Sequence, residues 1–508
     1  MNASTNAPES PQPPGLARNW VTLLGAALAL VSLANILFLL VVDVFIEQRA
    51  KPYVGVFAYV VFPAVMILGL LIVPLGLLLE RWRRRRRAPE EIPAFPRIDL
   101  NLPGHRQAFG LLAGFTAFFL VLSSVGSYRA YQFSDSVTFC GQACHSPMKP
   151  QFTAYQASPH ARVPCVECHV GPGATWFVRS KLSGAYQVYA VARDIFPRPI
   201  PSPIKSLRPA QETCEECHWP EKFWGAQSKV VTHFGVDEKN TPRQIRMLIK
   251  TGGGSPTTGL TTGIHWHMNI MNEVWYIAKD PQRQEIPWVR VRDRQGRVTE
   301  YRAKDSQLTA ADIARAEKRR MDCMDCHNRP SHVFVPPDRA VDDALLAGRI
   351  DVSLPYIKRQ AVEVLAKPYP SSEAAREGLA TELDRFYVRN YPALYPRKES
   401  VIKSAIAEVQ RIYATNIFPE MKTDWRTHPN NIGHFYYPGC FRCHAGQLVS
   451  QEGKAISKDC EICHTILGQE EGRQPMATVR GRPFRHPAEI GDLGAATCSE
   501  CHSGGPGP

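Results

Sequence analysis

The cysteines of this chain are its strongest constraint, because each belongs to a short box that ends in histidine. All 14 cysteines fall into seven boxes, in which two cysteines separated by two or three residues are followed at once by a histidine. Two thiols on one short turn can each form a thioether to the same porphyrin, and the adjacent histidine can bind its iron. The pattern predicts seven covalently bound c-type haems. The boxes are Cys140, Cys144 and His145; Cys165, Cys168 and His169; Cys214, Cys217 and His218; Cys323, Cys326 and His327; Cys440, Cys443 and His444; Cys460, Cys463 and His464; and Cys498, Cys501 and His502.

Other uses of paired cysteines explain this pattern less well. Zinc ribbons, disulfides and redox-active CxxC turns all employ such pairs, but none requires a histidine after every pair. Zinc sites would also group the pairs in twos, and seven is an odd number. The sequence therefore favours haem.

Composition indicates what surrounds the boxes. Mean hydropathy is only −0.23 although the first 130 residues are strongly apolar, so the remainder is polar, and 42 prolines are spread along the chain. We predict a mainly α-helical fold with extensive irregular structure, packed around haem rather than around a large aliphatic core. The formal net charge of +13 does not predict a nucleic-acid partner, because haem propionates would add about two negative charges per haem and offset it.

Three apolar segments, residues 20–46, 54–79 and 108–126, are each long enough to cross a bilayer. Residues 1–18 are rich in proline and serine and are predicted to be disordered. A cleaved signal peptide is the alternative for the first segment, but the apolar run continues past its small-residue site. The arginine run 81–87 follows the second segment, and the positive-inside rule places it in the cytoplasm. The chain after residue 126 is then periplasmic, on the side of a bacterial inner membrane where c-type haem is attached.

The periplasmic part divides into three stretches. Residues 127–236 hold the first three boxes, residues 237–427 hold the fourth box and a haem-free helical insert, and residues 428–508 hold the last three. Alternating apolar residues predict a small β-hairpin of residues 288–293 and 297–302. Amphipathic periodicity predicts helices over residues 174–194, 309–320, 338–347, 371–390 and 398–416.

Second axial ligands can be sought among the histidines outside the boxes. Of the 16 histidines, seven belong to boxes, and His105 lies on the cytoplasmic side. The remaining eight nearly match the number of irons, which predicts mostly bis-histidine, low-potential haems. The first box has a wider spacing and Met148 three residues after its histidine, so a thioether ligand or an open position is the alternative there. The candidates are His160, His233, His265, His267, His332, His428, His434, His486 and Met148.

Between residues 105 and 235 an apolar segment runs into a haem box, followed by SPH, then CVECHVGPG, then a helical stretch that bears Lys181. In these motifs the chain resembles the NapC/NirT family of membrane-anchored quinol dehydrogenases. The resemblance implies that the first haem lies beside a quinol pocket containing Lys181. The family's acid, seven residues after this lysine, falls on Val188 here, so Asp194 is a substitute candidate. Family members have one membrane helix and four or five haems, whereas the complete layout here resembles seven-haem inner-membrane cytochromes of metal-respiring bacteria.

These features together predict an inner-membrane quinol dehydrogenase with the haem domain in the periplasm. The resemblance implies that menaquinol is oxidised and that electrons pass to periplasmic c-type cytochromes in anaerobic or extracellular respiration. Reverse flow to quinone would use the same residues. A terminal reductase of a small nitrogen or sulfur oxyanion is the alternative enzyme, although a CxxCK box is absent from the sequence. A haem-based sensor or a simple electron wire would lack the quinol site.

Overall fold

The computed structural model describes two compact units. Residues 1–139 and 170–185 form the first unit, and residues 140–169 and 186–508 form the second. The residues described are 16, 19–45, 61–85, 100–143, 145–171, 174–204, 207–219, 223, 225–252, 263–268, 272–293, 295–471, 481–486, 491 and 496–506.

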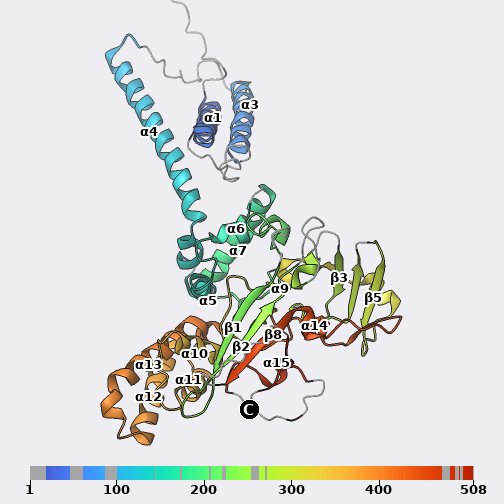
Figure 1. Ribbon diagram of the computed structural model, residues 1–508. Helices are drawn as coiled ribbons and strands as arrows, with labels where there is room; N and C mark the ends of the chain where they lie inside the picture. The colour runs from blue at the N-terminus through green and yellow to red at the C-terminus, as the bar shows by residue number, and fades with distance from the viewer. Residues whose placement is uncertain are drawn as a thin grey trace, which may run out of the picture. The chain divides into compact units, whose positions relative to one another are not determined.

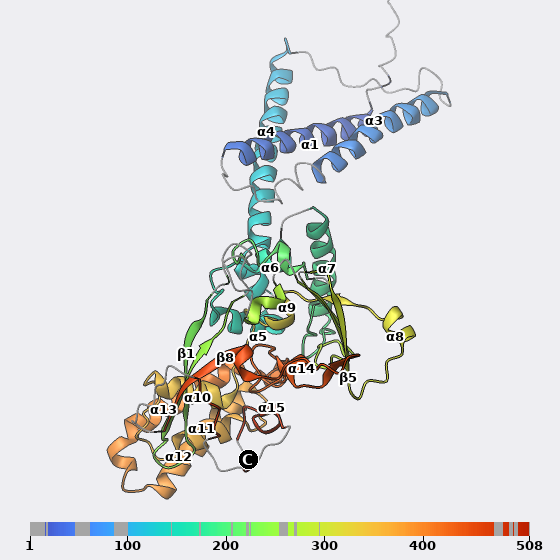
Figure 2. The ribbon, with the colours of Figure 1, turned by 45° about the vertical axis from the view of Figure 1, so that its right-hand side comes forward.

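Among its described residues, the first unit has three helices of membrane-spanning length and composition, α1 (Trp20–Phe45), α3 (Phe62–Arg85) and α4 (Pro103–Ser134). The three predicted spans are thereby confirmed, although α4 continues to Ser134, and the start of the second span lies outside the described residues. Helices α1 and α3 run side by side (Figures 1 and 2). Glycines permit their close approach, since a Cβ on Gly25 would lie 2.7 Å from the carbonyl oxygen of Gly69.

The haem-free insert forms a helical bundle with an apolar core of its own. Helices α10 (Pro337–Leu346), α11 (Ile357–Leu365), α12 (Ser372–Asn390) and α13 (Tyr395–Asn416) gather at one end of the second unit (Figures 1 and 2). Leu354, Leu379 and Leu383 are fully buried among them. The expectation that the periplasmic part lacks a large aliphatic core is therefore wrong for this stretch. Many of its charged residues lie on outer faces of the helices, although Asp342, Lys358 and Glu408 are buried. These charged residues lower the mean hydropathy, which therefore does not reveal the core.

Most of the predicted helices are present. Helix α7 (Ala174–Ala192) and the bundle helices match the expected periods, with α13 kinked at Lys398. Residues 309–320 are an exception, because α8 (Ala310–Arg315) ends early and Arg319–Arg320 forms strand β6. Helix α5 (His145–Gln156) follows the first box. The remaining helices are single turns within boxes, α6 (Cys165–His169), α9 (Cys323–Cys326), α14 (Phe441–His444) and α15 (Cys498–Cys501).

The second unit holds two antiparallel sheets, more β-structure than the single hairpin predicted. The hairpin itself, β4 (Trp288–Arg292) and β5 (Val298–Ala303), is confirmed. It belongs to a five-stranded sheet of order β6-β3-β4-β5-β7, completed by β3 (Glu273–Ile277) and β7 (Leu448–Ser450). Strands β1 (Gln227–Phe234), β2 (Pro242–Ile249) and β8 (His464–Glu471) form the other. Because β7 and β8 come from beyond residue 440, their pairing could not be inferred from local pattern.

Candidate haem-binding sites

Six box histidines each face one histidine from outside the boxes. The two rings of each pair are separated, centre to centre, by 5.9 to 6.3 Å. The pairs are His218 with His160, His169 with His332, His327 with His265, His444 with His267, His464 with His434, and His502 with His486.

This separation fits an iron atom between the two rings. A coordinating imidazole nitrogen lies about 2 Å from a metal and about 1 Å from its own ring centre, which places two ring centres about 6 Å apart. The histidines also gather in twos, as the two axial positions of a haem require. A group of three or more histidine, cysteine, aspartate or glutamate side chains suited to a bare metal ion does not occur among the described residues.

The ring nitrogen that would not bind iron is held by the backbone in several of these residues. A Nδ1–H that donates to a carbonyl leaves Nε2 free as a ligand and fixes the direction of the ring. Burial lowers the pKa of His332, to about 4 with help from Arg329, and keeps the ring neutral as ligation requires. The Nδ1 contacts are His265 with Thr251 O (2.8 Å), His267 with Ile264 O (2.9 Å), His332 with Gln151 O (3.0 Å), His160 with Pro330 O (3.3 Å) and His444 with Ser457 O (2.8 Å).

The other candidate ligands are not paired with a box histidine among the described residues. His233 lies 3.0 Å, through Nδ1, from Asp342 Oδ2 and stacks on Phe435. His428 is only 7% exposed, and within the described structure neither of its ring nitrogens has a hydrogen-bond partner. Burial, with the charge of Arg329, lowers its pKa to about 4. A buried imidazole of this kind fits an iron ligand. Because a box histidine does not face it among the described residues, its role as a ligand stays a prediction.

The first box is less fully described than the others. Cys144 lies outside the described residues, as does the side chain of His145, so a partner for this box is not assigned. Met148 lies within α5 and is partly buried. Its role as the sixth ligand, or an open sixth position, stays a prediction.

The thiols reveal which boxes are neighbours. A hydrogen bond with Cys140 lowers the pKa of Cys165 to about 7, and one with Cys323 lowers that of Cys214 to about 6. The first box therefore touches the second, and the third touches the fourth.

Four other thiols have a pKa raised by burial and, in addition, by a thiol of another box. Boxes two and three, four and five, five and six, and six and seven are thereby neighbours, so each box lies near the next one along the chain. The affected thiols and their neighbours are Cys168 with Cys214, Cys326 with Cys440, Cys463 with Cys440, and Cys498 with Cys460.

Asp325, inside the fourth box, fixes that box through three side chains that the sequence did not single out. The buried Asp325 Oδ1 accepts hydrogen bonds from Tyr276 Oη (2.5 Å), Arg283 Nη1 (3.0 Å) and Arg319 Nε (2.8 Å). Its backbone carbonyl accepts from Arg442 Nη2 of the fifth box at 2.7 Å. An acidic residue between two box cysteines was the only available signal, and it is also typical of an exposed turn.

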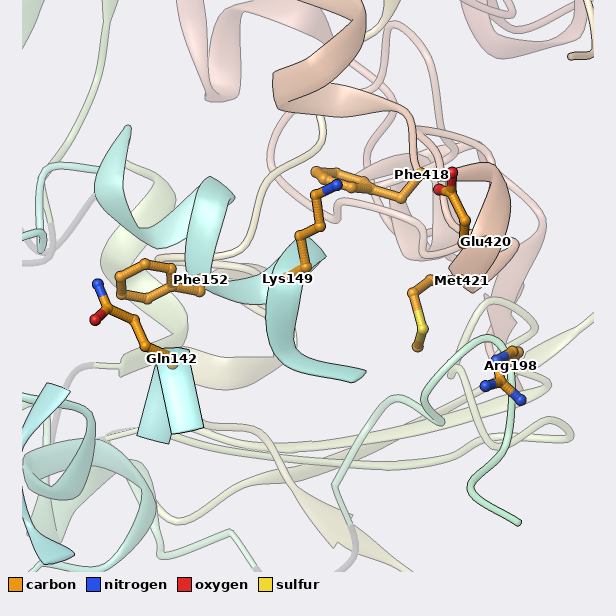
Figure 3. A pocket seen from close by; sticks show the side chains of 8 residues that line it. Gln142, Lys149, Phe152, Arg198, Phe418, Glu420 and Met421 are labelled. Carbon is orange, nitrogen blue, oxygen red and sulfur yellow. The ribbon is translucent and has the colours of Figure 1, made fainter. Parts of the chain in front are cut away.

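A cavity of about 550 Å³ lies beside the first box (Figure 3). Its wall combines apolar and charged side chains. Met421, which ends the 3₁₀ turn Pro419–Met421, contributes a thioether to this wall. Burial raises the pKa of Glu420, but hydrogen bonds from Ser372 and the charge of Lys149 outweigh this, and the pKa is lowered. The lining residues are Gly141, Gln142, Lys149, Phe152, Arg198, Phe418, Glu420 and Met421.

The structure describes Asp194 fully but only the backbone of Lys181, the two residues predicted to belong to the quinol site. Lys181 lies in α7, with its side chain outside the described residues. Asp194 follows the end of α7 in a left-handed conformation, with φ at 53°. It is paired with Arg198, Nη2 to Oδ1, at 2.5 Å, and Arg198 lines the cavity at the first box. Asp194 is thereby connected to this cavity.

Cysteine boxes with facing histidines, together with three membrane-length helices, define a membrane-anchored c-type cytochrome. Over 498 residues the chain is 46% identical to the Cytochrome c-type protein ImcH of Geobacter sulfurreducens, which covers 96% of this chain and 97% of that protein. The chain belongs to the ImcH family of c-type cytochromes, which confirms the expected relationship at the level of family. The number of haems stays a prediction. No family model and no solved structure matches it. Membership of the NapC/NirT family stays a prediction.

Proposed function

We propose that the protein is an inner-membrane heptahaem cytochrome that oxidises menaquinol and passes the electrons to periplasmic c-type cytochromes. The observation that carries this proposal is the set of six histidine pairs, each spaced for one iron and each joined to a cysteine box. The similarity to a c-type cytochrome over nearly the whole chain supports covalent haem and electron transfer. Haem, when bound, supplies a one-electron carrier at each box.

The residues of the chain would hold these carriers and set their spacing. The box cysteines would form the thioethers, and the box histidines with their facing histidines would hold the iron. Backbone carbonyls contact Nδ1 of several rings, which leaves their Nε2 atoms available as ligands. The contacts between consecutive boxes keep neighbouring sites close and in chain order. Two axial histidines at each such site favour a low potential and leave the position closed to substrates.

Quinol oxidation is proposed at the first box, because that box follows the last membrane-length helix after a few residues. A quinol must lose two protons as it loses two electrons. Lys181 would stabilise the oxygen that loses its proton, by charge or by a hydrogen bond. Asp194 would take up a proton and release it to the periplasm. Lys149 and Glu420 of the adjoining cavity offer further ionisable groups beside Arg198, the partner of Asp194.

The purified membrane protein tests this proposal directly. Pyridine haemochrome assay and intact mass are expected to show seven haems per chain, and a menaquinol analogue is expected to reduce them. Lys181→Ala is expected to lower the rate of quinol oxidation at unchanged haem content, whereas Lys229→Ala, on strand β1, is the matched control. A colourless product without added mass would refute haem binding. Unchanged turnover in Lys181→Ala would remove Lys181 from the quinol site.

A further inference from the structure

The 3₁₀ turn Ile264–Met268 carries two of the paired histidines one residue apart. The ring of His265 lies 6.3 Å from that of His327 in the fourth box, and the ring of His267 lies 5.9 Å from that of His444 in the fifth. We infer that this one turn supplies axial ligands to two different haems and so joins the four-box part of the chain to the three-box part. The inference rests on the proposed haem-binding function.

The geometry of the turn explains why the two rings reach different sites. In a strand, residues two apart would point to the same side of the chain. A 3₁₀ helix turns by about 120° per residue. The side chains of two residues that are two positions apart therefore differ in direction by about 240°. His265 and His267 therefore diverge toward two boxes.

Both rings are fixed in place from the backbone. Nδ1 of His265 contacts Thr251 O at 2.8 Å, and Nδ1 of His267 contacts Ile264 O at 2.9 Å, which leaves each Nε2 for iron. The turn is itself anchored to the end of β2, where Ile264 N donates to Lys250 O at 2.9 Å.

Gly263 permits this anchoring. Its φ of 104° lies in the region that favours glycine, and a Cβ there would lie 2.5 Å from Lys250 O. Any larger residue would displace the turn from β2 and move both histidines together.

The fourth and fifth boxes are held together independently of the two histidines. The thiol of Cys440 contributes, after burial, to the raised pKa of Cys326. Arg442 Nη2 donates to Asp325 O at 2.7 Å, and Asn431 Nδ2 donates to the same carbonyl at 3.0 Å. A single short turn can therefore reach both sites.

Trp266 lies between the two ligands in sequence and acts as a positioning residue. Its ring meets that of His267 edge to face, 5.7 Å between centres. Its carbonyl accepts a hydrogen bond from the buried Asn272 Nδ2 at 3.0 Å, and the indole packs against the core of the five-stranded sheet.

The two sites differ in the angle between their imidazole planes. The rings of His265 and His327 are nearly parallel, at 6°, whereas those of His267 and His444 are nearly perpendicular, at 87°. Parallel ligands split the iron d orbitals and give a rhombic low-spin ferric EPR spectrum. Perpendicular ligands leave two of these orbitals nearly degenerate and give a highly anisotropic signal. Each ligand therefore has a distinguishable spectroscopic signature.

The test uses the full-length protein in its native membrane, oxidised and examined by EPR, with haem content measured separately. His267→Met is expected to keep seven haems, because the thioethers remain, and to remove one highly anisotropic signal. His265→Met is expected to remove one rhombic signal instead. His105→Met, remote from every box in sequence, is the control and should change neither. If His267→Met does not accumulate, His267→Lys, which offers an amine nitrogen, is compared in the same way.

The outcomes separate the inference from the function on which it rests. If both variants leave all ferric signals unchanged at seven haems, the turn does not supply these ligands, although the protein still binds haem. If both variants remove the same single signal, the two histidines serve one haem and the bridge is refuted. A wild-type protein without covalent haem would refute the proposed function itself.

Discussion

At the scale of single residues, the sequence predicts the attachment sites but not the pairs of histidines that face each other. Each box is visible because its cysteines and histidine are adjacent, whereas the facing histidine comes from elsewhere in the chain. His332, which follows the fourth box, faces the histidine of the second, and His160, which precedes the second, faces that of the third. Such crossings depend on tertiary structure, so a count of histidines could predict the number of ligands but not their partners.

Asp325 is the residue of the fourth box whose substitution should lower the stability of the protein most. Asp325→Asn would keep the size of the side chain but remove the charge that faces Arg283 and Arg319. Asp325 is buried, whereas both guanidinium groups are partly exposed and Arg319 keeps its ion pair with Asp322. Because the charge-assisted hydrogen bonds to Asp325 are weakened, we expect a loss of about 2 kcal/mol in the free energy of unfolding. Thermal unfolding would measure it.

The control for this substitution is Asp293→Asn, in the turn of the β4–β5 hairpin. Its ion pair with Arg297 is largely exposed to solvent, and such pairs contribute little. The same loss of stability in both variants would contradict a special role for Asp325.

At the scale of elements, the long helices and one β-hairpin were predictable, whereas the complete sheets were not. The periods of α12 and α13 extend over five turns or more, so their existence could be inferred from sequence alone. Strand β8 instead begins at a box histidine, where His464 is paired with Ile249 of β2. Its residues carry no alternating pattern, because this edge of the sheet is fixed by the attachment site rather than by an apolar face.

The helical bundle should be stable without any contribution from haem. Leu379→Ala would leave a cavity in a fully buried position of α12, and we expect a loss of about 3 kcal/mol in the free energy of unfolding of the bundle. Haem content and the EPR signals should remain those of the wild type, because the core that contains Leu379 is formed mainly by residues of the bundle, although it extends to Ala154 of α5.

Leu346→Ala in α10 is the matched control, since that side chain is 58% exposed. Circular dichroism during thermal unfolding would separate the two variants. A loss of haem from Leu379→Ala at temperatures where the bundle is still folded would show instead that the bundle core also supports the haem sites.

At the scale of the whole molecule, the order of the boxes decides how electrons can travel. Each box neighbours the next, from the first at Cys140 to the seventh at Cys498. Sequence predicted seven sites and an apolar anchor before them, but adjacency along the whole series required coordinates. In such a series every electron passes through each internal site, whereas the first site receives electrons and the last one releases them.

This order predicts the effect of removing one site. Cys214→Ala combined with Cys217→Ala abolishes thioether attachment at the third box, and the six remaining haems are then divided into two before the gap and four after it. A menaquinol analogue should rapidly reduce about two of the six, because transfer across the gap is slow. Cys498→Ala combined with Cys501→Ala removes the last box, and all six remaining haems should be reduced at the wild-type rate, while transfer to an external cytochrome is lost. Stopped-flow absorbance measures the rapidly reduced fraction, and full rapid reduction in the first variant would show that the sites form a branched network rather than a single series.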